Sequence, residues 1–337
     1  MTRSTISVTA RIVNGFVTRR DTGEPELLEA GRDGMSDADL RRISRGGGGQ
    51  VQATGGNPAG VVLDADGLSD AQMLEIAQKV GLSETAFVSR SRTEGFKLDF
   101  FTPARRIAHC GHATIATFSY LAELGRVEEG ETSKETVDGP RKIIIRDGAA
   151  YMEQLAPRYE TAADWADRGV QLQDILAALG LDEGSLDPRF APVLANTGNS
   201  FVLVAVKDAS VLAAIRPRQP QIEGISEALD LIGFYVFTTD PAATAADAAT
   251  RMFAPRYGIA EESATGMAAA PLACALYDHL GVRKPKLMIE QGHFMVPASP
   301  SEITVELELD AGRITGLMAG GSGAVMKEME ISLQDRA

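Results

Sequence analysis

The feature that most constrains the fold is a set of three short sequence matches that recur in the same order along the 337 residues. The matching segments are "GGNPAGVV" (55–62) with "TGNSFVLV" (197–204), "FTPARRIA" (101–108) with "FAPRYGIA" (253–260), and "CGHATIATFSYLAELG" (110–125) with "TGMAAAPLACALYDHLG" (265–281). One such match arises readily by chance, whereas three in order indicate a duplicated unit. Each copy spans roughly 150 residues, which is a usual domain size. We therefore expect two domains of one fold.

Each copy contains one apolar stretch of helical length. Residues 107–122 and 263–277 contain no Asp, Glu, Lys or Arg. A helix that is apolar on all sides is a buried helix. The segments around it, such as "KIIIR" (142–146) and "FYVFTT" (234–239), are rich in strand-forming residues. A sheet curled around a central helix fits both observations.

A second helix is predicted in the first copy, over about 69–80. Ser69 and Gln72 have capping-box spacing, and Met73, Ile76, Ala77 and Val80 form one apolar face. Gly81 ends this helix, and "GLSETAF" (81–87) then leads into a strand. Glu84 is a lone carboxylate at this join. It is either a solvated turn residue or a general base, and the local residues alone favour the turn residue.

The predicted division of the chain places the first domain at 1–147 and the second at 148–322. The segment at about 20–54 has no counterpart in the second copy and contains four consecutive glycines from Gly46, so it is expected to be a surface insertion or a flap. The last strand, 323–333, is expected to return to the sheet of the first domain.

Composition excludes several classes of protein. A net charge of −13 argues against binding to a nucleic acid backbone. No apolar run reaches the length of a membrane span, and the N-terminus lacks the apolar core of a secretory signal. Two cysteines fit a reducing compartment, so we expect a cytoplasmic protein. The histidine spacing does not predict a metal site.

The two apolar helices begin at "CGHAT" and "SATGM", which are small-residue sequences without acids. A helix N-terminus presents unpaired N–H groups and a partial positive charge, so it can bind a carboxylate. In a duplicated protein, two such starts can face each other across a cleft. The expected partner is therefore a small substrate that carries a carboxylate.

The ordered motifs "GNPAGVV", "LSETAF", "FTP", "CGHATIA", "TGNSFVLV", "FAPRYGIAEESATGMAA" and "EQG" (290–292) resemble those of the PhzF family of phenazine-biosynthesis-like isomerases, relatives of diaminopimelate epimerase. The resemblance covers nearly the whole chain except 20–54. It implies an α+β fold of two pseudo-symmetric domains, each a mixed β-sheet rolled around a central buried α-helix. It also implies an active site between the domains, a homodimer, and no cofactor.

The resemblance assigns roles to individual residues. Glu84 matches the glutamate of the family's S-E-T motif, its acid/base, and His112 matches a residue that contacts substrate. Gly111 and Gly266 would let the backbone approach a substrate carboxylate. Cys110 stands where the epimerase relatives keep a catalytic thiol, but here a small buried residue is the simpler interpretation. The full expected set is Glu84 as the catalytic residue, with Cys110, Gly111, His112, Asn57, Glu262, Ser263, Thr265, Gly266 and Met267 as substrate-binding residues.

The chain departs from the family pattern at several positions. Glu262 replaces an aspartate, Met267 replaces a serine, Arg106 replaces an acid, and "QGHFMVPASPS" (291–301) lacks an arginine. These changes leave the fold and Glu84 in place but put the family's dihydro-hydroxyanthranilate substrate in doubt.

Three functions remain open. The first is a cofactor-free isomerase that moves a proton on a small carboxylic acid, with Glu84 as acid/base. The second is a racemase, epimerase or dehydratase that uses Cys110, with Ser263 taken as the matching position in the second copy. The third is a metabolite-binding protein without catalysis.

Overall fold

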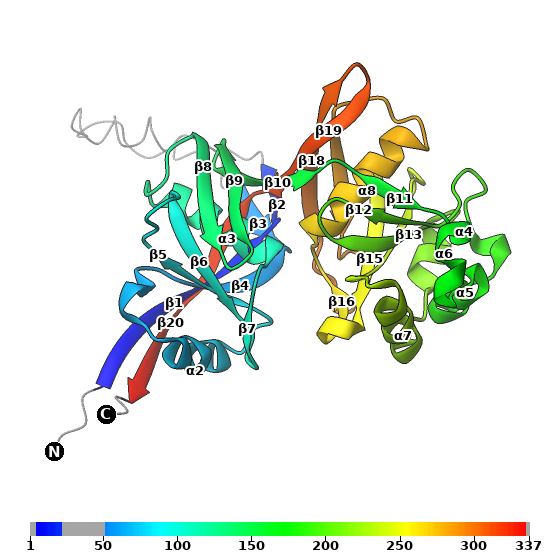
Figure 1. The fold of residues 1–337 in the computed structure, drawn as a ribbon. Helices are drawn as coiled ribbons and strands as arrows, with labels where there is room; N and C mark the ends of the chain where they lie inside the picture. Colours follow the sequence, from blue (N-terminus) through cyan, green and yellow to red (C-terminus); the bar gives the residue numbers. More distant parts are fainter. Residues whose placement is uncertain (1–4, 22–50, 335–337) are drawn as a thin grey trace, which may run out of the picture.

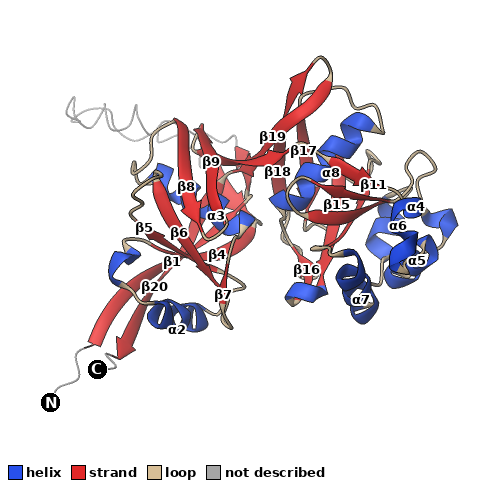
Figure 2. Cartoon of the chain, viewed as in Figure 1, coloured by secondary structure: helices blue, strands red, loops and turns tan. Residues whose placement is uncertain are grey.

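The computed structural model describes residues 5–21 and 51–334, which form two similar halves (Figure 1). In each half, strands of a mixed sheet surround one helix, and further helices lie on the outside (Figure 2). The predicted α+β class, with two pseudo-symmetric units that each have a central helix, is confirmed.

The described part of the first half contains the α-helices α2 (Asp70–Val80) and α3 (Gly111–Glu123). Its strands are β1 (Thr5–Gly15), β4 (Asn57–Val62), β5 (Thr85–Ser89), β6 (Phe96–Phe101), β7 (Arg106–Ile107), β8 (Gly130–Thr136), β9 (Gly139–Arg146), β10 (Ala149–Leu155) and β20 (Gly323–Gln334).

The second half contains α4 (Ala162–Trp165), α5 (Leu172–Leu179), α6 (Ala209–Ala214), α7 (Gln219–Leu229) and α8 (Gly266–Asp278). Its strands are β11 (Arg158–Glu160), β12 (Val193–Asn196), β13 (Ser200–Ala205), β14 (Gly233–Thr238), β15 (Ala248–Ala254), β16 (Ile259–Glu262), β17 (Lys286–Gln291), β18 (Ser301–Asp310) and β19 (Arg313–Gly321).

The strands pair in the same order in both halves. In the first, β4 and β5 are parallel, β5 and β6 antiparallel, β6 and β7 antiparallel, β6 and β8 parallel, and β8 and β9 antiparallel. In the second, β13 to β18 repeat these five pairings with the same directions. A duplicated gene segment explains this identity of topology, because two unrelated domains would have no reason to share it.

The registers of the ladders give residue-by-residue equivalence between the halves. Thr85 lies opposite Gly60 in the first half, and Phe234 lies opposite Val202 in the second. The sequence repeat matches residue 60 to residue 202, so Thr85 is equivalent to Phe234. The residue before each is then also an equivalent pair, Glu84 with Gly233.

The central helices α3 and α8 have the same length, and both are buried on nearly every side. Small residues allow this enclosure, since Ala, Gly and Thr leave room for the surrounding strands. The apolar side chains of the two helices belong to one continuous core that extends through both halves. This core fixes the two helix starts relative to each other.

The outer helix α2 matches its prediction. Ser69 and Gln72 form the expected capping box, Gly81 ends the helix in the left-handed conformation, and the buried face is the predicted one. This packing against β5 and β20 holds the segment that follows α2, which contains Glu84.

Two strands tie the halves together. β20, at the end of the chain, pairs antiparallel with β1 along its length, so it lies in the sheet of the first half (Figure 1). β10 pairs with β9 on one side and with β19 on the other. Because β10 joins both sheets, a domain boundary at residue 147 stays a prediction.

Most of the predicted insertion at 20–54 lies outside the described residues. Its described ends form a small sheet of two antiparallel strands, β2 (Thr18–Asp21) and β3 (Val51–Thr54). Among residues 5–21 and 51–334, no helix has both the length and the apolar character needed to cross a membrane.

Candidate active site

Glu84 lies in the short connection between α2 and β5, and its side chain is buried. Its carbonyl oxygen accepts a hydrogen bond from the Gly60 N–H at 3.0 Å, which fixes the connection against β4. The interpretation of Glu84 as a solvated turn residue is therefore wrong. A buried carboxylate needs a compensating partner.

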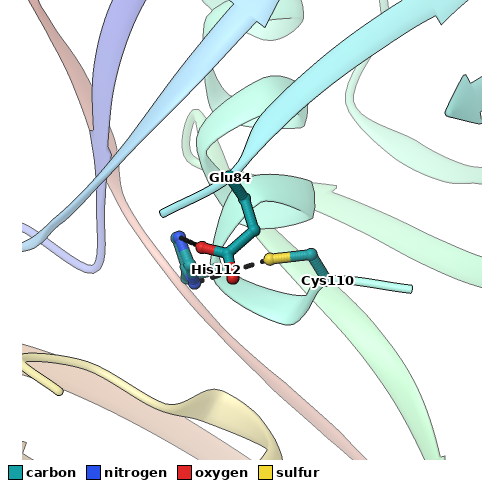
Figure 3. Close-up of side chains that lie close together, drawn as sticks. All are labelled: Glu84, Cys110 and His112. Carbon is teal, nitrogen blue, oxygen red and sulfur yellow. Dashed lines mark hydrogen bonds and ion pairs between the residues drawn. The ribbon is translucent and has the colours of Figure 1, made fainter. Parts of the chain in front are cut away.

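The partner is His112, in the first turn of α3. His112 Nε2 lies 3.4 Å from Glu84 Oε2, and Nδ1 lies 3.4 Å from Glu262 Oε1 and 3.5 Å from Cys110 Sγ. Figure 3 shows Glu84 and Cys110 converging on the ring from different segments. Two carboxylates that are far apart in the sequence thus share one imidazole.

The electrostatics of this group favour a positively charged ring. Burial by itself lowers the pKa of His112, but contacts with Cys110 and with the two carboxylates outweigh burial and raise this pKa well above its ordinary value. Burial raises the pKa of the Cys110 thiol; His112 opposes this, Glu84 acts in the same direction as burial, and the net shift is upward. The thiol is therefore neutral near pH 7, and the carboxylates are the groups that balance the His112 charge.

Glu262 is fixed by neighbours from both halves. Its Oε1 accepts a hydrogen bond from Asn57 Nδ2 at 2.9 Å, and its Oε2 accepts one from Thr265 Oγ1. Asn57 also donates to the Ala264 carbonyl at 3.0 Å. Asn57 thus crosses from the first half to hold the connection that precedes α8.

The two helix starts line one cavity of about 810 Å³. The two helix starts lie close together. Gly111 has no side chain, and a Cβ atom added to it would lie only 3.1 Å from Met267 Cγ. Inside this cavity wall, Glu84 Oε2 and His112 Nε2 are buried and have no hydrogen-bond partner of good geometry among the described residues. Two polar atoms without such partners at one point of a cavity wall are suited to receive a ligand.

Most of the predicted site residues line this cavity, and two do not. The lining includes Glu84, Cys110, Gly111, His112, Glu262, Thr265, Gly266 and Met267. Asn57 lies behind Glu262, as described above. The Ser263 hydroxyl donates to the Gly56 carbonyl at 3.0 Å, so it fixes the backbone between the halves.

The choice of Ser263 as the counterpart of Cys110 is wrong. Cys110 is the residue immediately before α3, and Thr265 is the residue immediately before α8. Thr265 is thus the equivalent of Cys110, and Met267 is the equivalent of His112. The sequence repeat of 110–125 with 265–281 pairs the same two residues, Cys110 and Thr265.

Sequence reasoning did not assign roles to two glutamines that fix the second helix start. Gln291 accepts a hydrogen bond from the Thr265 N–H at 3.1 Å and donates to the Glu262 carbonyl at 2.8 Å. Gln154 donates to the Gly266 carbonyl at 3.2 Å. The "EQG" motif contained the signal for Gln291, while nothing local to Gln154 indicated its role.

Glu84, Cys110 and His112 each offer one ligand atom within a span of 4.8 Å, a set that could hold a metal ion. Binding would require the Cys110 thiol to lose its proton and the His112 ring to be neutral. The pKa of each group is raised, which opposes both changes, and we assign no metal here.

Comparisons with known proteins agree with the fold. The sequence model of the family described as "Phenazine biosynthesis-like protein" matches residues 51–328. An "uncharacterized isomerase" of Deinococcus radiodurans is 33% identical over 81% of this chain and 89% of its own length. The trans-2,3-dihydro-3-hydroxyanthranilate isomerase of Pseudomonas aeruginosa is 30% identical over 81% of this chain and 92% of its own length.

A solved structure extends this likeness to three dimensions. The crystal structure of a phenazine biosynthesis protein of the PhzF family from Bacillus anthracis covers 97% of this chain and 99% of its own, with a TM-score of 0.76 and 24% identity. With the family match over most of the chain and the duplicated fold described above, the chain belongs to the phenazine biosynthesis-like (PhzF) family.

Proposed function

We propose that the protein is a cofactor-free isomerase in which Glu84 moves a proton between two carbons of a small carboxylic acid. The observation that carries this proposal is the buried contact of Glu84 with His112 at the wall of the cavity. The isomerase class is also that of the relatives named above.

The N–H groups at the starts of α3 and α8 would hold the substrate carboxylate, because both starts line the cavity and a helix N-terminus favours an anion. Glu84 would then remove a proton from an activated carbon. The electron pair of the broken C–H bond forms a new C=C bond, and the existing double bond shifts. Glu84 returns a proton to the carbon at the far end of the shifted system, and exchange of its carboxyl proton with solvent before this return brings solvent hydrogen to that carbon.

His112 would assist by its charge. A cation that lies 3.4 Å from a carboxylate oxygen of both Glu84 and Glu262 offsets the cost of burying two negative charges. As Glu84 takes the proton, His112 keeps Glu262 as its partner. The second carboxylate therefore keeps the charge of the group balanced through the transfer.

A racemase with two bases is disfavoured by the equivalence between the halves. The counterpart of Glu84 is Gly233, where an added Cβ would lie 2.2 Å from the Phe253 carbonyl oxygen. The counterpart of Cys110 is Thr265, whose hydroxyl already binds Glu262. The second half therefore offers no base at either equivalent position.

The test is a kinetic comparison of variants. Small unsaturated carboxylic acids, trans-2,3-dihydro-3-hydroxyanthranilate among them, are screened for isomerisation by ultraviolet absorbance. With any acid that reacts, Glu84→Gln should lower kcat by about 10²–10⁴-fold, the usual contribution of a general acid/base. The affinity of the Glu84→Gln variant for that acid should stay within about twofold of the wild-type affinity, because the amide keeps the shape of the side chain.

Glu128→Gln is the matched control, since Glu128 is an exposed acid of the first half outside the cavity. It should leave both constants unchanged. Turnover that survives Glu84→Gln would remove Glu84 from the mechanism.

The family resemblance also predicts a homodimer. Size-exclusion chromatography with light scattering should give about twice the chain mass of 35.8 kDa. A mass equal to that of one chain would contradict this prediction.

A further inference from the structure

A group of cationic and hydrogen-bond-donating side chains lies beside the first helix start, outside the acid/base group. Lys134 of β8 is fully buried, and its ammonium donates to Thr114 Oγ1 at 2.6 Å and lies 3.1 Å from His109 Nδ1. Arg141 lies directly opposite Lys134 on β9. Residues paired in this way project from the same face of a sheet, so two cations share one face.

This pair has no counter-ion among the described residues. Lys134 and Arg141 form no ion pair there, and the hydrogen bond given by the Arg141 side chain goes to the neighbouring Pro140 carbonyl at 2.8 Å. Asp138, in the turn between β8 and β9, also lines the cavity, but it is exposed and forms no ion pair with either of them among the described residues. Like charges opposite each other are unfavourable, and a buried charge without a partner is costly.

The second half shows that the fold does not require these charges. The ladder β15–β17 places Ile289 at the position that Lys134 has in β6–β8. Ile303 lies opposite Ile289, as Arg141 lies opposite Lys134, and both isoleucines are fully buried. The residue before the helix-capping position is His109 in the first half and the buried Ala264 in the second.

The same duplicated scaffold thus carries an apolar trio in one half and a cationic, donor-rich trio in the other. His109 and Arg141 line the cavity that contains Glu84, whereas Lys134 lies behind them. A hydrogen bond from the Lys134 ammonium to Nδ1 leaves the proton of neutral His109 on Nε2. His109 and Arg141 then offer the cavity N–H donors, which suit an anion.

We propose that the end of the cavity at His109 and Arg141 binds a second anionic group of the substrate, so that the substrate is a small acid with two anionic groups. This inference rests on the proposed function, in which the first carboxylate lies at the two helix starts. A cavity of about 810 Å³ has room for both groups. Arg141 and His109 are the specificity-determining residues, and Lys134 is a positioning residue that acts through His109.

Lys134 also gives the site a pH dependence. Burial lowers the pKa of Lys134 to about 7; Arg141 acts in the same direction, while Cys110 and Asp138 oppose it. The ring of His109 stays neutral, because burial, with Lys134 and Arg141, holds its pKa well below the ordinary value. A bound anion favours the charged form of Lys134, so binding should tighten as the pH falls from 8.5 to 6.

The experiment measures binding of benzoate and of its three ring-carboxylated forms, phthalate, isophthalate and terephthalate, by calorimetry. At least one dicarboxylate should bind the wild-type protein about tenfold more tightly than benzoate, the gain expected from one charge-assisted contact. Arg141→Met should abolish this preference and leave the affinity for benzoate within about twofold. Arg141→Lys should restore part of it.

Two further variants sharpen the result. Arg313→Met removes an exposed arginine of β19 outside the cavity and should change neither affinity. Lys134→Met should remove the pH dependence of the ratio between dicarboxylate and benzoate affinities. This ratio cancels the titration of His112, which acts on both ligands.

The inference is overturned if none of the three dicarboxylates binds more tightly than benzoate, or if Arg141→Met weakens all four acids equally. These outcomes are independent of catalysis. If Glu84→Gln keeps its turnover while the dicarboxylate preference holds, the proposed function fails and the second anion site stands.

Discussion

The starts of the two central helices, α3 and α8, have the same backbone and different chemistry. Both begin at a glycine that lines the cavity, Gly111 or Gly266. The other equivalent pairs differ: Glu84 with Gly233, Cys110 with Thr265, and His112 with Met267. Under the proposed function, duplication preserved two helix starts that bind the substrate anion, while the side chains proposed to transfer a proton lie at the first start.

At the second helix start, hydrogen bonds from neighbouring side chains hold a carboxylate in place. Glu262 lies opposite Met252 of β15 as Ile107 lies opposite Phe100 of β6, so these strand pairings make Glu262 the equivalent of Ile107. Glu262 is held by Asn57, Thr265 and the network around Gln291. Its role in this account is to balance the charge of His112 from across the cavity. If the proposed function holds, a symmetric scaffold can carry a single-base site, because each half supplies a helix start while only one half supplies the base.

The largest effect is expected from His112→Ala, which removes the group that joins the two starts. Glu84 and Glu262 would be left buried without their shared cation, and breaking a buried ion pair costs roughly 3–5 kcal/mol of stability. Urea unfolding of the variant and the wild-type protein measures this cost. His293→Ala is the control, because His293 is largely exposed and near one carboxylate only at 3.8 Å.

The sign of the pH dependence follows from the raised pKa of His112. The stability that the charged ring contributes is fully present below the unfolded pKa, about 6.5, and is lost as the pH rises through the higher folded pKa. The difference in unfolding free energy between wild type and His112→Ala should thus be larger at pH 6 than at pH 9. A difference that grows toward pH 9 would mean that the ring is neutral.

The next effect tests whether the cations of the first half are needed for folding. Lys134→Met, which imitates the apolar residue of the second half, should stabilise the protein by roughly 1–4 kcal/mol, as replacing buried ionic groups often does. Since the lowered pKa of Lys134 is about 7, the wild type recovers stability between pH 7 and pH 10. The difference in unfolding free energy between Lys134→Met and the wild type should therefore become smaller from pH 7 to pH 10. A destabilised variant would show that the lysine belongs to the fold.

A smaller effect concerns Met267 and Glu262 at the second start. Met267 stands where the family offers a hydroxyl, so a substrate that needs this hydrogen bond loses about 1–3 kcal/mol. The wild-type protein should turn over trans-2,3-dihydro-3-hydroxyanthranilate weakly or not at all. Met267→Ser combined with Glu262→Asp should increase that activity, followed by ultraviolet absorbance at equal enzyme concentration. Efficient turnover by the wild type would show that these two residues do not set the substrate.

The smallest effect is expected from Cys110→Ser. The thiol is neutral and lies 3.5 Å from His112 Nδ1, a position in which a hydroxyl can also hydrogen-bond. The change in kcat/KM should stay below about fivefold, equivalent to less than ~1 kcal/mol. Ser263→Ala gives a comparison outside the cavity, since that hydroxyl donates a hydrogen bond to the Gly56 carbonyl. A loss as large as that expected for Glu84→Gln would return the thiol to the mechanism.

The fold could be predicted from the sequence because its signals are local or repeated. The capping box at Ser69, the apolar helices and the duplicated motifs each act over a few residues, and all three are present in the structure. The position of Glu84 at a helix–strand join was also visible, although its burial was not. Burial depends on the packing of α2 and β4 around that join.

The contacts across the site could not be predicted in this way. His112 meets Glu262 across 150 residues of sequence, and Arg141 faces Lys134 only because the β8–β9 register places them opposite each other. A shift of one residue in that register would turn one of the two side chains to the other face of the sheet. The sequence motifs name the acid/base candidate, while the registers decide what surrounds it.

The most direct test of the central claim is incorporation of solvent deuterium, because it follows the proton itself. The reactive acid is incubated in D₂O with the wild type, Glu84→Gln and Cys110→Ser, and deuterium at carbon is followed by NMR. The account predicts that Cys110→Ser incorporates deuterium at close to the wild-type rate and that Glu84→Gln incorporates none above background. Incorporation that survives in Glu84→Gln and disappears in Cys110→Ser would contradict it and identify the thiol as the base.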